Sequence, residues 1–148
     1  CNSFNNLANS TTALASSAAA TTSTSNNIVD AMVQVKVTGP ATMTASGSTI
    51  VSIFAYGSLS GDAGWYAGAS SGTVETVDGS DKALTISANG NNLRFLGTIL
   101  LHTTTAGTSI VYQSEPMSIA AAFGGIMPRK WGIVLQNQSS AIYPIWRV

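Results

Sequence analysis

Few side chains in this sequence could support catalysis, and they are not spaced for it. The chain has one histidine, His102, in the segment LLHTTT, and one cysteine, Cys1, far from it in sequence. A serine or cysteine nucleophile needs a nearby base, so a catalytic dyad or triad would depend entirely on His102 as that base. A conventional zinc site needs about four nitrogen or sulfur ligands, more than these two residues supply. The sequence therefore predicts a protein that is not an enzyme, in which His102 lies at the end of a strand.

The acidic residues define neither a catalytic pair nor a metal site. They are Asp30, Asp62, Glu75, Asp78, Asp81 and Glu115. Hydrolysis of a glycoside needs two facing carboxylates, and nothing in the spacing of these acids selects one pair. The segment DGSDK at 78–82 could offer oxygen ligands to calcium, but it has fewer such ligands than a D-x-D-x-D-G loop. Its sequence is equally typical of an ordinary turn. We expect no metal and no cofactor.

Two pairs of residues could instead bind a partner. Trp65 and Tyr66 lie in the Gly/Ser-rich segment SLSGDAGWYAGASSG. Exposed aromatic rings there would stack on sugars or anchor a protein interface, and buried rings would form the loop's own core. Arg129 and Lys130 could belong to a phosphate-binding loop, but the G-x-x-x-x-G-K-[ST] pattern is absent and the lysine precedes a strand. They are predicted to be solvated charges at the edge of that strand, with a neighbouring subunit as a further contact.

The composition predicts association with other copies or other proteins. Charged residues make up 8% of the 148 residues, against about 25% in a typical soluble domain, and the formal net charge is +0. Such a surface has little charge repulsion to keep copies apart, so we expect a homo-oligomer covered by neighbours. A secreted β-protein with a neutral Ser/Thr-rich surface is the alternative. Six cations spread from Lys36 to Arg147 exclude the basic patch that nucleic acid requires.

The ends of the chain and its apolar runs bear on its location. A single cysteine excludes an intrachain disulfide. No apolar run reaches the roughly 18 residues of a transmembrane helix, and no signal peptide is visible, so no membrane partner is expected. Cys1 follows either from removal of an initiator methionine or from processing of a lipoprotein. The second origin would attach the chain to a membrane and remains open.

The chain divides into a polar segment at 1–27 and a β-rich domain at 28–148. Residues 1–27 carry no charge, glycine or proline, and Leu7 and Leu14 are their aliphatic anchors. This segment is expected to be an extended arm laid on a neighbouring surface, with a short helix over 7–20 as an alternative. The domain shows alternating or short apolar runs bounded by turn residues, at 31–38, 49–57, 83–88, 93–102, 109–114, 131–137 and 141–148. Pro144 is expected to confine the last run to a sheet edge. The pattern predicts an all-β fold, an antiparallel β-sandwich or jelly roll with an extended N-terminal arm.

Residues 118–141, SIAAAFGGIMPRKWGIVLQNQSSA, resemble the C-terminal signature of a family of small virion structural proteins of tailed bacteriophages. In that family a Ser-[Val/Ile]-Ala-Ala-Ala-Phe-Gly-Gly run leads through Leu/Met-Pro to Arg/Lys-Trp-Gly-Ile-Val. Weaker matches follow the same order at 30–37, 51–58 and 91–99. The resemblance therefore spans nearly the whole chain.

The resemblance implies a non-enzymatic β-sandwich that is assembled onto a virion in the bacterial cytoplasm. Its expected role is capsid decoration or cementing through the major capsid protein and other virion proteins, and a tail component is the alternative, as is a carbohydrate-binding module using Trp65 and Tyr66. Deletion of residues 1–25 is then expected to leave the sandwich folded but to weaken particle binding. The candidate interface residues are Leu7, Leu14, Trp65, Tyr66, Arg129, Lys130 and Trp146.

Overall fold

The computed structural model describes the backbone of residues 4–7, 12–21, 29–39, 50–58, 66–70, 73–76, 82–83, 93–102, 110–138 and 143–145. These residues form thirteen strands and one short helix. The elements are β1 (Phe4–Leu7), β2 (Thr12–Thr21), β3 (Met32–Val33), β4 (Lys36–Thr38), β5 (Ile50–Ser58), β6 (Tyr66–Ser70), β7 (Thr73–Thr76), β8 (Lys82–Ala83), β9 (Arg94–Leu100), β10 (Val111–Gln113), β11 (Met117–Ser118), α1 (Ile119–Ala122), β12 (Lys130–Asn137) and β13 (Tyr143–Ile145).

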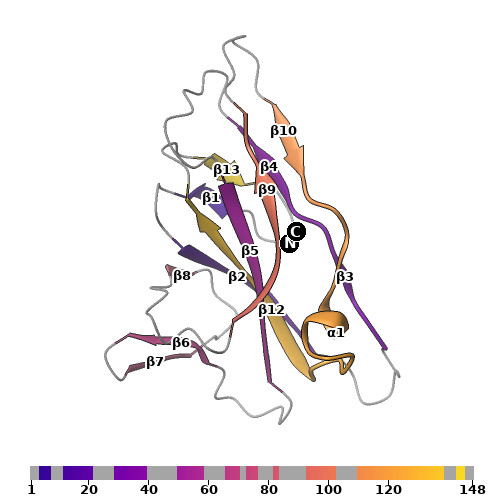
Figure 1. Cartoon of the computed structure of the whole chain (residues 1–148). Helices are drawn as coiled ribbons and strands as arrows, with labels where there is room; N and C mark the ends of the chain where they lie inside the picture. Colours follow the sequence, from indigo (N-terminus) through magenta and orange to yellow (C-terminus); the bar gives the residue numbers. More distant parts are fainter. Residues whose placement is uncertain are drawn as a thin grey trace.

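The strands form two larger sheets and two strand pairs, and every pairing is antiparallel. One sheet has five strands in the order β8-β2-β12-β5-β9, and the other has four in the order β1-β13-β4-β10 (Figure 1). The pairs are β3 with β11 and β6 with β7. The all-β prediction is confirmed, and α1 spans only four residues. Within the described part of the chain, no helix is long and apolar enough to span a membrane.

The centre of the five-stranded sheet is built from two long strands with apolar runs, β5 and β12. β12 pairs with β5 over eight consecutive residues, from Lys130↔Ser58 to Asn137↔Val51. Alternate residues of each strand point to the same face, so Ile133 and Leu135 join the hydrophobic core. The opposite face of these strands is also covered, because Tyr56 and Val134 are fully buried there. The strand predicted over 49–57 is therefore confirmed as β5, and it is covered on both faces.

One core cluster collects side chains from both larger sheets. Val33, Val35 and Val37, which follow β3 into β4, belong to the same cluster as buried residues of β5, β9 and β12. Ile119, the first residue of α1, is also fully buried in it. Removal of this apolar surface from water is the main force that holds the strands together.

The N-terminal segment departs from the expected arm. β2 pairs with β12 of the same chain, from Thr12↔Gln136 to Thr21↔Lys130, and β1 pairs with β13. The helix considered over 7–20 is wrong where the structure describes this segment, because residues 12–21 are a strand. The physical reason is that β12 offers a long row of backbone donors and acceptors for pairing. An isolated helix of Ser, Thr and Ala would be less stable than the strand that pairs with this row.

The expectation that Pro144 marks a sheet edge is also wrong. β13 lies between β1 and β4, inside the four-stranded sheet. Its paired residues are Tyr143, opposite Leu7, and Ile145, opposite Phe4 and Val37. A proline is tolerated between them because the pairs fall on its two neighbours, so the missing N–H interrupts a short ladder instead of a long one. Asn89-Gly90, a dipeptide typical of a hairpin turn between the runs at 83–88 and 93–102, lies outside the described residues.

Candidate functional site

One end strand of each larger sheet lies next to one of the other. In the part of the chain that the structure describes, β9 ends the five-stranded sheet and β10 ends the four-stranded sheet. Tyr112 in β10 joins them, because its hydroxyl accepts a bond from the backbone N–H of His102 at 3.3 Å and donates to the carbonyl of His102 at 3.0 Å. His102 follows the end of β9 by two residues, as the sequence predicted. Its backbone thus helps to hold two sheet edges in register.

Apolar side chains are exposed along both of these edges. In β9, Phe95 and Leu100 are 60% and 61% exposed, and in β10 Val111 is 60% exposed. The ring of Phe95 packs edge-on against Phe54 of the neighbouring strand, with ring centroids 5.7 Å apart and an interplanar angle of 69°. This contact fixes the direction of an exposed aromatic ring, which is a property of interface anchors.

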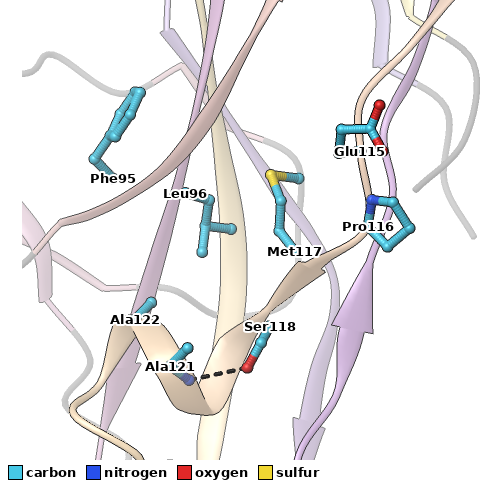
Figure 2. Close-up of a pocket in the computed structure, with 8 residues that line it drawn as sticks. All are labelled: Phe95, Leu96, Glu115, Pro116, Met117, Ser118, Ala121 and Ala122. Carbon is cyan, nitrogen blue, oxygen red and sulfur yellow. Dashed lines mark hydrogen bonds between the residues drawn. The ribbon is translucent and has the colours of Figure 1, made fainter.

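An open groove lies between β9 and the segment that leads from β10 into α1. Its volume is about 480 Å³, and it is lined by Phe95, Leu96, Glu115, Pro116, Met117, Ser118, Ala121 and Ala122. Figure 2 shows Leu96 and Met117 between the strands and the ring of Phe95 on the other side of β9. Gly97 allows this packing, because the position of a Cβ atom there lies only 3.1 Å from the sulfur of Met117. A second hollow of about 400 Å³ adjoins the groove at Ala122 and is bounded by Arg94, Phe123, Gly124 and Ile126.

A β-bulge shapes one wall of the groove. Gln113 pairs with Lys36 and Met117 pairs with Val33, so residues 114–116 stand opposite residues 34 and 35. The buried hydroxyl of Ser114 accepts the backbone N–H of Val35 at 3.0 Å, and the N–H of Ser114 donates to the carbonyl of Val35 at 2.9 Å. Pro116, which has no N–H to give, is placed in the bulge where none is required.

Substitution of Ser114 by alanine is expected to destabilise the protein by about 1–3 kcal/mol, because the buried N–H of Val35 loses its acceptor. The free energy of unfolding from urea titration measures this. Ser52→Ala is the matched control: Ser52 and Ser114 are both 6% exposed, but the Ser52 hydroxyl donates to the side chain of exposed Gln138. Equal losses in the two variants would contradict a special role for the Ser114 hydroxyl.

The start of α1 is held by Asp30, a residue distant in sequence. One carboxylate oxygen of Asp30 accepts from the backbone N–H groups of Ala31 at 2.7 Å and Ala120 at 2.9 Å. Its other oxygen accepts from the hydroxyl of Ser118 at 2.6 Å, and that hydroxyl in turn accepts the N–H of Ala121 at 2.9 Å. Ser118 is therefore the helix N-cap. The hydrogen bond from Ser118, followed by that from Ala120, lowers the pKa of Asp30 below its ordinary value.

Asp30→Asn is expected to destabilise the protein at neutral pH, and this difference is expected to shrink in acid. A carboxylate with a lowered pKa stabilises the fold above its unfolded value of about 3.9 and loses that effect as the pH falls through the folded pKa. Urea midpoints of both proteins across the acid range measure the effect. Ser118→Ala should move the NMR titration of Asp30 upward, toward its ordinary value. A difference between wild type and Asp30→Asn that is independent of pH would contradict this assignment.

The two glycines after α1 end the helix. Gly124 and Gly125 have φ of 73° and 88°, in the left-handed region that glycine adopts without strain. The N–H of Gly125 donates to the carbonyl of Ala120 at 2.8 Å, and that of Gly124 donates to Ala121 at 3.3 Å. These two bonds form a Schellman motif, which caps the carbonyls of the last turn. The chain then turns back into β12, the central strand.

The residues singled out from the sequence do not form one site where the structure describes them. Arg129 is exposed next to the start of β12, and Lys130 is its first residue. Leu7, Leu14 and Tyr66 belong to strands of three different sheets, β1, β2 and β6. Trp65 and Trp146 lie outside the described residues, so the carbohydrate-binding hypothesis stays a prediction.

Chemistry-bearing groups remain scattered in the described part of the chain, where no three His, Cys, Asp or Glu side chains gather around a point. The sequence GASSG at 68–72 matches the G-x-S-x-G pattern of a nucleophile elbow. That motif requires a strand-turn-helix context, whereas Ser70 ends β6 and pairs with Thr73 at the start of β7. The match therefore lacks the geometry that would expose a nucleophile.

The residues that shape the groove were not predicted from the sequence. Pro116, between the strand-forming residues 111–113 and 117–118, was a usable signal for a bulge, because proline is confined to edges and bulges in sheets. Nothing local could have connected Asp30 with Ser118, since 88 positions separate them. Comparison with protein-family models, with curated proteins and with solved structures finds no match.

Proposed function

We propose that this protein is a non-enzymatic structural protein of a tailed-bacteriophage virion, which decorates or cements the capsid shell by binding the major capsid protein. The resemblance of residues 118–141 to virion proteins supports this role. In this proposal the two larger sheets face each other as a β-sandwich, and α1 closes one end of it.

The observation that carries the proposal is the apolar free edge of β10. Val111 is 60% exposed and Ile110 is 40% exposed, and β10 has a partner, β4, on one side only in the sheet order. A strand edge with exposed aliphatic side chains can add to a sheet of another protein or pack on an apolar surface. Because only 8% of the residues are charged, the desolvation free energy of burying this surface would be small.

The test is whether the protein is a stoichiometric part of the particle. Purified virions are expected to contain it at a copy number comparable with that of the major capsid protein. A copy number far below this would assign it to the tail, against the proposal, and its absence from intact particles would exclude both locations.

Particle binding is also expected to depend on Val111. Val111→Lys should abolish rebinding of recombinant protein to particles that lack it, since a lysine ammonium resists desolvation. Val29→Lys is the matched control, because Val29 is 82% exposed and lies away from the β10 edge, before β3. Equal binding by the two variants would overturn the assignment of β10 as the contact.

A further inference from the structure

Among the described strands, β9 is the last of its sheet and has a neighbour, β5, on one side only. Residues 95–101, FLGTILL, contain no charge and no proline to discourage pairing with another strand. Free edges in natural proteins are normally blocked by charges, proline or bulges. β9 has a bulge at Leu96, where its register with β5 shifts between Gly97↔Ile53 and Phe95↔Phe54. Residues 97–100 keep a regular register beyond it.

The solvent-facing side of β9 carries two large apolar side chains, one on each side of a threonine. Phe95, Thr98 and Leu100 lie on one face, since they stand opposite Phe54, Ser52 and Ile50 of β5. All three are exposed, Phe95 and Leu100 by 60% and 61%. An antiparallel strand with the same sequence would set Phe95 of one copy opposite Leu100 of the other. Aromatic-aliphatic pairs of this kind stabilise neighbouring strands.

A charge of opposite sign lies toward each end of the groove. Arg94 bounds the hollow at the end near Phe123, and Glu115 lines the groove at the end near Pro116. Both side chains are exposed. A two-fold axis reverses the direction of the groove, so it brings Arg94 of each copy toward Glu115 of the other. The formal net charge of +0 adds no long-range repulsion between copies.

We propose that two copies of this chain associate about a two-fold axis through antiparallel pairing of their β9 edges. The pairing covers Phe95 and Leu100 and places opposite charges at both ends of the contact. It extends each five-stranded sheet into its partner's, and β10, which lies beside β9, is not one of the two paired strands. This inference is independent of the proposed virion role, because it concerns a different edge and is tested on the purified protein.

The first test is sedimentation equilibrium of the purified chain. Wild type is expected to be a dimer, and Thr98→Lys should weaken it at least about tenfold, because the two lysines would meet near the axis. Val111→Lys, on the β10 edge, should leave the dissociation constant unchanged while abolishing particle binding. Wild type that is monomeric at about 100 µM, or a dimer that Thr98→Lys leaves intact, overturns the proposal.

The second test uses charge reversal. Arg94→Glu and Glu115→Arg should each weaken the dimer, since each places like charges together twice in the interface. The double variant should dimerise again, and a mixture of the two single variants should form the mixed dimer. A dimer that is insensitive to both single reversals, or a double variant no better than either single one, contradicts the proposed axis.

A cross-linking experiment covers the case in which a lysine at 98 prevents folding. Thr98→Cys in a Cys1→Ser background places the cysteines of two copies next to the axis, where oxidation should give a covalent dimer in high yield. Val29→Cys in the same background is the control and should remain monomeric on denaturing gels. Equal cross-linking at both positions would show random collision and would overturn the proposal.

Discussion

A chain that lacks residues 1–25 is expected to lose about 5 kcal/mol or more of unfolding free energy, at about 1 kcal/mol for each hydrogen bond lost with β2, and thus to be largely unfolded. β2 stands between β8 and β12 in the five-stranded sheet and pairs with β12 from Thr12 to Thr21. Its removal leaves one side of the central strand without partners. Far-ultraviolet circular dichroism and urea titration of the truncated chain measure the effect.

Deletion of residues 1–10 is the matched control for this result. It removes β1, which lies at the edge of the four-stranded sheet, and keeps β2. The short deletion should lower the urea midpoint moderately and leave a cooperative transition. If the chain without residues 1–25 unfolds with the midpoint of the full-length protein, the original expectation of a dispensable arm is right and the pairing of β2 with β12 is not important for stability.

Gly132→Ala is expected to be the most damaging small substitution in β12, with a loss of about 3 kcal/mol. Gly132 stands directly opposite Tyr56 in β5, and the Tyr56 ring lies across the position that a Cβ atom would take. The ring cannot move aside easily, because Tyr56 is only 1% exposed and is packed on all sides. Thermal and urea unfolding of the variant measure the loss.

Gly97→Ala is the matched control, because it lies in the same sheet and faces only the flexible end of Met117 at 3.1 Å. Its loss should be clearly smaller. Tyr56→Leu is expected to recover part of the stability in the Gly132→Ala background, giving a coupling energy between the two positions. Additive effects of the two substitutions would show that the glycine is required for another reason.

The strands that could be predicted from the sequence are those whose own apolar pattern accounts for their burial. The runs at 31–38, 49–57 and 131–137 alternate or are continuously apolar, and they became β3–β4, β5 and β12. The same reasoning failed for residues 12–21, where Ala, Ser and Thr carry almost no pattern. That strand forms because β12 offers a ladder of hydrogen bonds, a property of a segment more than a hundred positions away. The pairing of β13 inside its sheet, in spite of Pro144, has the same tertiary origin.

The candidate site was less predictable than the fold. The aromatic and charged residues chosen from the sequence were chosen for their chemical type, whereas the exposed edges at Phe95 and Val111 follow from which strands lack a neighbour. Strand order is decided by long-range pairing and cannot be seen in a local pattern. The Gly124-Gly125 bend was predictable, because glycine has a conformational freedom that acts locally.

The pairing of β1 with β13 makes the chain nearly circular. Phe4 lies opposite Ile145 in adjacent antiparallel strands, so the first and last described strands are hydrogen-bonded neighbours. A short peptide linker between Phe4 and Ile145 could connect β1 and β13 without disturbing either sheet, and a chain closed at this point would lose less chain entropy on folding than an open one. Two peptides attached at these two positions would leave the sheet side by side, which suits this pair of strands to the paired display of foreign sequences.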